Sequence, residues 1–95
     1  MKNVFKERLA QGALQLGTIV TLPSMEVTEI LCLAGFDWLF VDLEHSAMGV
    51  QEAQALLQAA GPKVPCVVRV PTIDEVWIKK CLDTGAAGMV LAATP

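Results

Sequence analysis

The sequence lacks any cluster of positive charge. Charged residues make up 18% of the 95 residues, the net charge is −3, and the seven lysines and arginines are scattered singly or in one pair. A nucleic-acid partner would need a basic stripe that follows the phosphate backbone, so we expect none. The hydrophobic content of 54% instead indicates a globular chain, much of which is buried.

Long hydrophobic runs and paired cysteines are also missing. Residues 1–11 carry four charged side chains, and later apolar runs are only as long as a strand. We therefore expect no signal peptide, no membrane span or membrane partner, and a cytoplasmic location. Cys32, Cys66 and Cys81 are an odd number at wide spacing within apolar segments, which predicts reduced, buried thiols and neither a disulfide framework nor a zinc site.

The hydrophobic pattern that is present changes period several times, and a glycine or a helix-capping residue marks each change. Unbroken apolar runs predict strands near residues 16–21, 38–41, 64–70 and 89–91. Between them, apolar residues at helical spacing predict helices, two of which begin after the capping residues Ser24 and Asp74. The expected buried stripes of these two helices are Val27, Ile30, Leu31 and Ala34, and Ile78, Cys81 and Leu82.

Alternating strands and helices restrict the fold. The strands start about every 21 to 27 residues, close to the roughly 30-residue unit of an eightfold (β/α) barrel. Parallel strands with crossover helices leave a barrel or an open doubly wound sheet. A glycine-rich G-x-G-x-x-G or Walker loop would favour the open sheet, and the sequence has neither. We predict an α/β fold, a parallel barrel of TIM type, with residues 1–95 forming the N-terminal half of one domain and about its first four strands.

Polar side chains stand out where the second and third strands end. Asp42, Glu44 and His45 follow the second strand, and Arg69 lies near the end of the third. The carboxyl ends of parallel strands meet at one edge, where ligands bind in both candidate folds, so we expect these groups to converge. A carboxylate such as Asp42 that accepts a hydrogen bond from Nδ1 would fix the tautomer of His45 and leave Nε2 able to take a proton.

The same residues have simpler explanations. From spacing alone, a surface position without a role is an equal alternative for His45. Arg69 needs an anionic partner, either a protein carboxylate (Asp42 or Glu44) or a substrate oxyanion, and the protein pair is slightly favoured. Glu44 is a candidate metal ligand or hydrogen-bond acceptor, but the acids and His45 here do not supply a full metal cage. Asp83 is expected in a helix C-terminal turn.

Several segments together resemble a known family. They are Gly35-Phe36-Asp37-Trp38, Val41-Asp42-Leu43-Glu44-His45, Val68-Arg69-Val70-Pro71 and Ile78-Lys79-Lys80-Cys81-Leu82-Asp83-Thr84-Gly85-Ala86-Ala87-Gly88. The string is similar to the class II pyruvate aldolases of the HpcH/HpaI aldolase/citrate lyase family, which act on substrates such as 2-keto-3-deoxyglucarate and 2-keto-3-deoxyrhamnonate. The resemblance covers nearly the whole chain in the order of the family.

The resemblance implies a barrel enzyme that cleaves a 4-hydroxy-2-oxo acid into pyruvate and an aldehyde. A divalent cation (Mg²⁺, Mn²⁺ or Co²⁺) would hold the 2-keto acid and stabilise the enolate. On this mapping His45 is the base, Asp42 orients it, and Arg69 binds the keto or enolate oxygen of the substrate. The metal-binding Glu and Asp of the family follow later strands, so no metal ligand is assigned within residues 1–95.

Two alternatives differ in class from the aldolase. One is a catalytically inactive, truncated fragment that self-associates through its exposed strand edges and apolar helix faces; the aldolase itself is also expected to be a homo-oligomer. The other is an acyl-CoA lyase of the wider citrate-lyase-like superfamily, although the basic residues that bind the coenzyme phosphates are not evident. The sequence leaves the aldehyde and the metal open.

Overall fold

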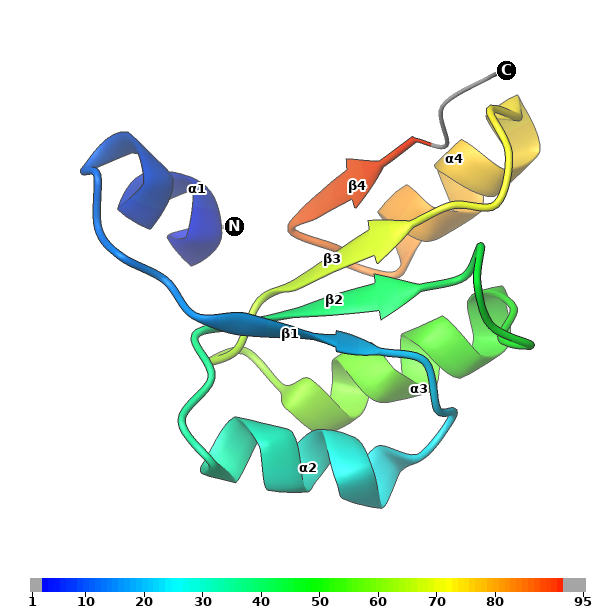
Figure 1. The fold of residues 1–95 in the computed structure, drawn as a ribbon. Helices are drawn as coiled ribbons and strands as arrows, with labels where there is room; N and C mark the ends of the chain where they lie inside the picture. The colour runs from blue at the N-terminus through cyan, green and yellow to red at the C-terminus, as the bar shows by residue number, and fades with distance from the viewer. Residues whose placement is uncertain (1–2, 92–95) are drawn as a thin grey trace.

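The computed structural model describes residues 3–91, which form four helices and one sheet of four parallel strands (Figure 1). The strands lie side by side in chain order, β1-β2-β3-β4. Each of the first three strands is followed by a helix that returns the chain to the start of the next strand, as in consecutive units of a TIM barrel. The elements are α1 (Val4–Ala10), β1 (Gly17–Val20), α2 (Met25–Leu33), β2 (Trp38–Asp42), α3 (Val50–Ala60), β3 (Cys66–Arg69), α4 (Glu75–Asp83) and β4 (Gly88–Val90).

The predicted helix starts are confirmed. The hydroxyl oxygen of Ser24 accepts a hydrogen bond from the backbone N–H of Val27 at 3.1 Å. The carboxylate of Asp74 accepts from the N–H groups of Val76 and Trp77 at 2.8 and 3.3 Å. These side chains satisfy backbone donors that have no partner within the first turn of a helix. The caps therefore fix the points at which α2 and α4 begin.

The predicted buried stripe of α2 was wrong in part. Ile30 is 63% exposed and Ala34 is also exposed, while Thr28 is completely buried. Thr28 tolerates burial because its hydroxyl donates to the carbonyl of Ser24 at 3.0 Å, which leaves no unsatisfied donor. The helix thus turns Thr28 and Leu31 toward the core, a rotation that hydrophobicity alone does not predict.

The stripe predicted for α4 was also wrong at one position. Cys81 is completely buried and Ile78 is partly buried, as expected, but Leu82 is 56% exposed. Trp77 packs against the core instead. Trp77 and Cys81 are four residues apart and therefore lie on one face of the helix, which Leu82 does not share.

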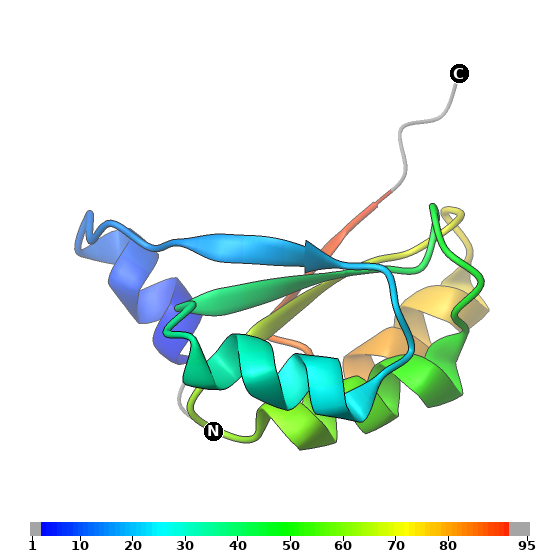
Figure 2. The ribbon, with the colours of Figure 1, turned by 60° about the horizontal axis from the view of Figure 1, so that its bottom comes forward.

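Helices α2, α3 and α4 cover one face of the sheet (Figure 2). The core lies between these two layers and is built from alternate strand residues and the inner side of α3. Its fully buried members come from β2, from β3 and the residue that follows it, and from α3 and α4: Leu39, Val41, Val68, Val70, Ala53, Leu56 and Cys81. The burial of apolar side chains at this interface is the main source of stability for the fold.

On the opposite face of the sheet, the only helix contact among residues 3–91 that we describe is that of Phe5, from the N-terminal helix, with Trp38 at the start of β2 (Figure 2). Strand register places Ile19, Phe40 and Val67 in one row on this face, and Asp42 and Arg69 in the next row toward the strand ends. Ile19 is 61% exposed. In a closed barrel this face becomes the interior, so its apolar residues are in the positions that a barrel core requires.

Helix α1 lies near the start of the strands, away from the ends of β2 and β3 (Figure 1). The side-chain amide of Asn3 donates to the carbonyl of Ala87, just before β4, at 2.9 Å. The ring of Phe5 lies 5.2 Å from that of Trp38. Trp38 in turn lies across Gly17, where an added Cβ would come within 2.4 Å of the indole ring. A side chain at position 17 would therefore displace the indole.

The thiols of Cys32, Cys66 and Cys81 are free, Cys66 and Cys81 buried and Cys32 partly buried. Burial raises the pKa of the Cys66 thiol to about 12. None of the helices between residues 3 and 91 has the length and apolar character needed to cross a membrane.

Candidate active site at the ends of β2 and β3

Asp42 and Arg69 form the centre of the site. They are the last residues of neighbouring strands and are partners in the register of the sheet, so their side chains point from the same face. The Nε and Nη2 atoms of Arg69 donate to the two carboxylate oxygens of Asp42 at 3.2 and 2.5 Å. This is a bidentate pair, the geometry in which a guanidinium binds a carboxylate most strongly.

The carboxylate of Asp42 is 2% exposed yet fully paired. Besides Arg69, its Oδ1 accepts from the backbone N–H groups of Glu44 and His45 at 2.9 and 3.0 Å. The hydrogen bonds from Arg69, helped by those from the two backbone amides, outweigh the effect of burial and lower the pKa of Asp42 to about 2. The same carboxylate raises the pKa of Arg69. The pair is ionised at any physiological pH.

The loop after β2 is folded back by the same aspartate. Its side chain closes a turn over Glu44 and His45, and its carbonyl accepts from the hydroxyl of Ser46 at 2.5 Å. The Ser46 oxygen accepts in turn from the N–H of Met48 at 3.2 Å, and the side chain of Met48 is buried in the core. The loop that carries Glu44 and His45 is therefore held at both ends.

Glu44 lies between His45 and Arg69. Its Oε1 atom is 3.3 Å from Nε2 of His45 and 3.6 Å from Nε of Arg69. The imidazole is 68% exposed at the mouth of the site, whereas the guanidinium is 26% exposed. The imidazole of His45 and the guanidinium of Arg69 thus both approach the same carboxylate oxygen of Glu44, at the edge of the sheet where the strands end.

The site agrees with the sequence-based expectation in some contacts and corrects it in others. Arg69 has the predicted carboxylate partners, with Asp42 bound directly and Glu44 nearby. The predicted contact between Asp42 and the imidazole of His45 was wrong, because Asp42 binds the backbone N–H of His45 and its oxygens are otherwise taken by Arg69. The carboxylate next to the imidazole is that of Glu44.

The side chains of this site do not form a set of metal ligands. Among residues 3–91 no group of three or more His, Cys, Asp or Glu side chains is placed to hold a metal ion. The oxygens of Asp42 are already bonded to a guanidinium and two amides, which leaves Glu44 as the only carboxylate of this site whose oxygens have room for a cation. One carboxylate does not hold a divalent metal firmly.

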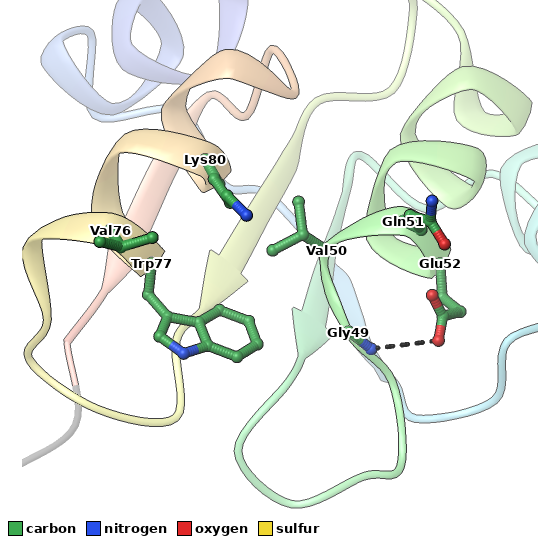
Figure 3. Close-up of a pocket in the computed structure, with 7 residues that line it drawn as sticks. All are labelled: Gly49, Val50, Gln51, Glu52, Val76, Trp77 and Lys80. Atoms are coloured by element: carbon green, nitrogen blue, oxygen red, sulfur yellow. Dashed lines mark hydrogen bonds between the residues drawn. The ribbon is translucent and has the colours of Figure 1, made fainter.

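A separate cavity of about 380 Å³ lies between the start of α3 and α4 (Figure 3). Val50 and Trp77 face one another across it, and Lys80 lies at one end. None of the four site residues lines it. This cavity belongs to the helical layer and is separate from the cluster of Asp42, Glu44, His45 and Arg69 at the strand ends.

Asp83 occupies the place that the sequence predicts, and Trp38 lies in a predicted strand. Asp83 is the last residue of α4 and is exposed. Trp38 is partly buried and packs against Phe5 and Phe40 on the face opposite the three covering helices.

With this geometry established, the sequence and the fold can be compared with known proteins. The sequence pattern of the HpcH/HpaI aldolase/citrate lyase family matches residues 15–94. The chain belongs to this family. The resemblance predicted from the segments around Asp42, Arg69 and Asp83 is thereby confirmed.

Several curated relatives are named as aldolases. The hydroxypyruvate/pyruvate aldolase of Sagittula stellata is 43% identical over 91 residues, which is 95% of this chain and 36% of that protein. The 4-hydroxy-2-oxo-heptane-1,7-dioate aldolase of Salmonella paratyphi B is 41% identical over 92 residues, which is 96% of this chain and 35% of the relative. The chain thus spans about a third of the length of the curated relatives it matches.

The fold matches solved structures, among them an HpcH/HpaI aldolase/citrate lyase family protein from Burkholderia cenocepacia J2315, which superposes with a TM-score of 0.87 at 32% identity over 98% of this chain and 38% of that chain. The crystal structure of the citrate synthase SbnG superposes with a TM-score of 0.89 at 28% identity, over 98% of this chain and 38% of SbnG. The four parallel strands and the helices that connect them are therefore those of a TIM-type barrel, as predicted.

Proposed function

We propose that a complete barrel that contains this chain cleaves a 4-hydroxy-2-oxo acid into pyruvate and an aldehyde. The observation that carries this proposal is the meeting of Arg69, Glu44 and His45 at the ends of β2 and β3. The aldolase names of the relatives support the same reaction class. The proposal concerns the whole barrel, because the chain covers about a third of these relatives.

Arg69 is the group that binds the oxygen on which negative charge develops. Two of its nitrogens donate to Asp42, which holds one edge of the guanidinium in place. Among residues 3–91 its Nη1 atom has no protein acceptor, so its N–H groups remain able to donate to the keto oxygen of the substrate. A donor held in place before the reaction stabilises an enolate without reorganisation.

His45 is the base. Its position beside Glu44 favours a proton on Nε2, because a carboxylate accepts from an N–H group, and leaves the lone pair of Nδ1 for the substrate. That nitrogen takes the proton of the C4 hydroxyl while the C3–C4 bond breaks. C4 becomes the carbonyl carbon of the aldehyde, the electron pair of the broken bond forms the C2–C3 double bond of pyruvate enolate, and the imidazolium returns the proton to C3.

A divalent cation, Mg²⁺, Mn²⁺ or Co²⁺, remains our prediction for the complete protein. Residues 3–91 do not fit such an ion, since they hold no group of three ligands, so its ligands would come from other parts of the barrel. No step above is routed through the metal. When bound, such an ion would add positive charge near the enolate oxygen.

A chimaera tests the reaction. Residues 1–95 would replace the matching third of the Sagittula stellata aldolase, and pyruvate release from a 4-hydroxy-2-oxo acid would be followed with added Mg²⁺ or Mn²⁺. We expect turnover that falls about 100- to 10,000-fold in His45→Ala, the range for loss of a general base. A chimaera without turnover, or one that His45→Ala leaves unchanged, would contradict the proposal.

Self-association is a second property that a specific observation favours. The bare face of the sheet carries Ile19, and β1 and β4 each pair on one side only within residues 3–91. Unpaired strand edges beside an apolar face promote association. We expect the 95-residue chain to sediment as an oligomer and Ile19→Lys to shift it toward monomer, with Gln54→Lys on α3 as the control. A monomeric wild-type chain would contradict this expectation.

A further inference from the structure

A row of aromatic side chains leads from α1 to the catalytic edge of the sheet. Phe5 of α1 packs against Trp38, with ring centroids 5.2 Å apart, and Trp38 packs edge-on against Phe40, with centroids 6.3 Å apart and rings at 69°. Trp38 and Phe40 are alternate residues of β2 and so lie on the same face as Asp42. Asp42 and Arg69 lie directly beyond the last ring of this row.

Arg69 rests on Phe40. The Cζ atom of its guanidinium lies 5.2 Å from the centroid of the phenyl ring, within the range of a cation–π contact. The register explains the contact. Phe40 pairs with Val67, two residues before Arg69 on β3, so Arg69 is its diagonal neighbour, within reach of a long side chain.

The phenyl ring supplies a restraint that Asp42 cannot. The two hydrogen bonds to Asp42 act along one edge of the guanidinium, and they leave it able to tilt about that edge. The ring lies below the guanidinium and limits this tilt. Phe40 is itself held in place, because Trp38 behind it lies against Gly17, where no side chain keeps the indole away.

We propose that Phe40 is a positioning residue for Arg69, backed by Trp38 and Phe5, and that it sets the direction in which Nη1 points out of the site. The catalytic part of this inference rests on the function proposed above for Arg69. The structural part stands without it. Helix α1, at the far end of the strands, is then connected to the site through the interior of the barrel.

Nuclear magnetic resonance of the isotope-labelled 95-residue chain tests the contact directly. The sequence holds two arginines, Arg8 and Arg69, and Arg8 is paired with Asp37 at 4.0 Å, so its Nε–H signal is an internal reference. We expect nuclear Overhauser effects between the Phe40 ring and the side chain of Arg69, and an upfield ring-current shift of the Arg69 protons. Absence of both in the wild-type chain would overturn the proposal without any variant.

Variants separate positioning from general stability. Phe40→Leu keeps an apolar side chain but removes the ring, so the Arg69 Nε–H group should lose its shift and exchange faster with water. Phe40→Tyr should retain both properties. Ile19→Val, next to Phe40 in the sheet register, is the control for loss of volume on the same face and should change neither. An Arg69 signal that is the same in Phe40→Leu as in the wild type would refute the proposal.

The chimaera extends the test to catalysis. Phe40→Leu should lower kcat/KM about 3- to 30-fold, the range expected from loss of a cation–π contact, and Phe40→Tyr should restore it. A kcat/KM unchanged in Phe40→Leu would refute the catalytic part. If no chimaera turns over, the proposed function fails, whereas the resonance measurements still decide whether Phe40 positions Arg69.

Discussion

The two central strands and the two outer strands of the sheet differ in how completely their side chains are buried or paired within the described residues. On β2 and β3, Leu39, Val41 and Val68 are completely buried and the charges of Asp42 and Arg69 neutralise one another. On β1, Ile19 is 61% exposed and Gly17 is covered only by an indole ring. The centre is therefore complete within residues 3–91, whereas the outer strands depend on whatever packs against them.

The largest loss of stability should come from substitutions between the sheet and the helices that cover it. Leu56→Ala on α3 removes a side chain that is 1% exposed and should cost about 2–5 kcal/mol of unfolding free energy. Leu33→Ala on α2 removes one that is 88% exposed and should change stability by about 0.5 kcal/mol or less. Urea unfolding followed by circular dichroism measures both. Equal losses would show that the helical layer is not the core we describe.

A comparison of two glycines sharpens the contrast between the outer strands. Gly17→Ala on β1 places a methyl group 2.4 Å from the Trp38 ring and should cost about 1–3 kcal/mol, because the indole must move. Gly88→Ala on β4 meets no atom closer than Val67 Cγ2 at 3.9 Å and should be nearly neutral. Thermal unfolding with tryptophan fluorescence follows both variants. A neutral Gly17→Ala would show that Trp38 is free to leave β1.

The smallest effect is a dependence of stability on pH, which arises from Asp42 at the end of β2. The pKa of Asp42 is about 2 in the folded chain and near 3.9 when unfolded, so the unfolded chain binds the proton first as pH falls. The stabilisation is complete above about pH 5 and is lost progressively toward pH 2. The unfolding free energy between pH 5 and pH 3 should fall less in Asp42→Asn than in the wild type. Parallel curves would mean that Asp42 is not tied to Arg69.

Much of the fold follows from local patterns in the sequence. The caps Ser24 and Asp74 and the apolar runs of β2 and β3 depend on neighbouring residues, so the sequence predicts them within a few positions. The side of α2 that is buried depends on a tertiary contact and on the satisfied hydroxyl of Thr28, and the hydrophobic stripe misses it.

The site was predictable in its members but not in all of its contacts. Asp42 and Arg69 come together because both end buried parallel strands, which the sequence shows. The pairing of His45 with Glu44 depends on the turn that Asp42 makes through backbone amides, and spacing along the chain does not determine it. The sequence does indicate that Phe40 and Asp42 lie on the same face, because they alternate along β2. That Phe40 lies under Arg69 follows only once the register of β2 and β3 is known.

The buried sulfur atoms have a chemical consequence. With a pKa of about 12, Cys66 is almost entirely in the uncharged form at neutral pH, and only the thiolate reacts readily with oxidants and alkylating reagents. Burial raises the pKa of Cys81 in the same direction. Partial burial and the nearby Glu29 raise the pKa of Cys32 as well, so all three thiols are kept protonated. Cys32 differs in being only partly covered, so oxidation of the three cysteines would begin there.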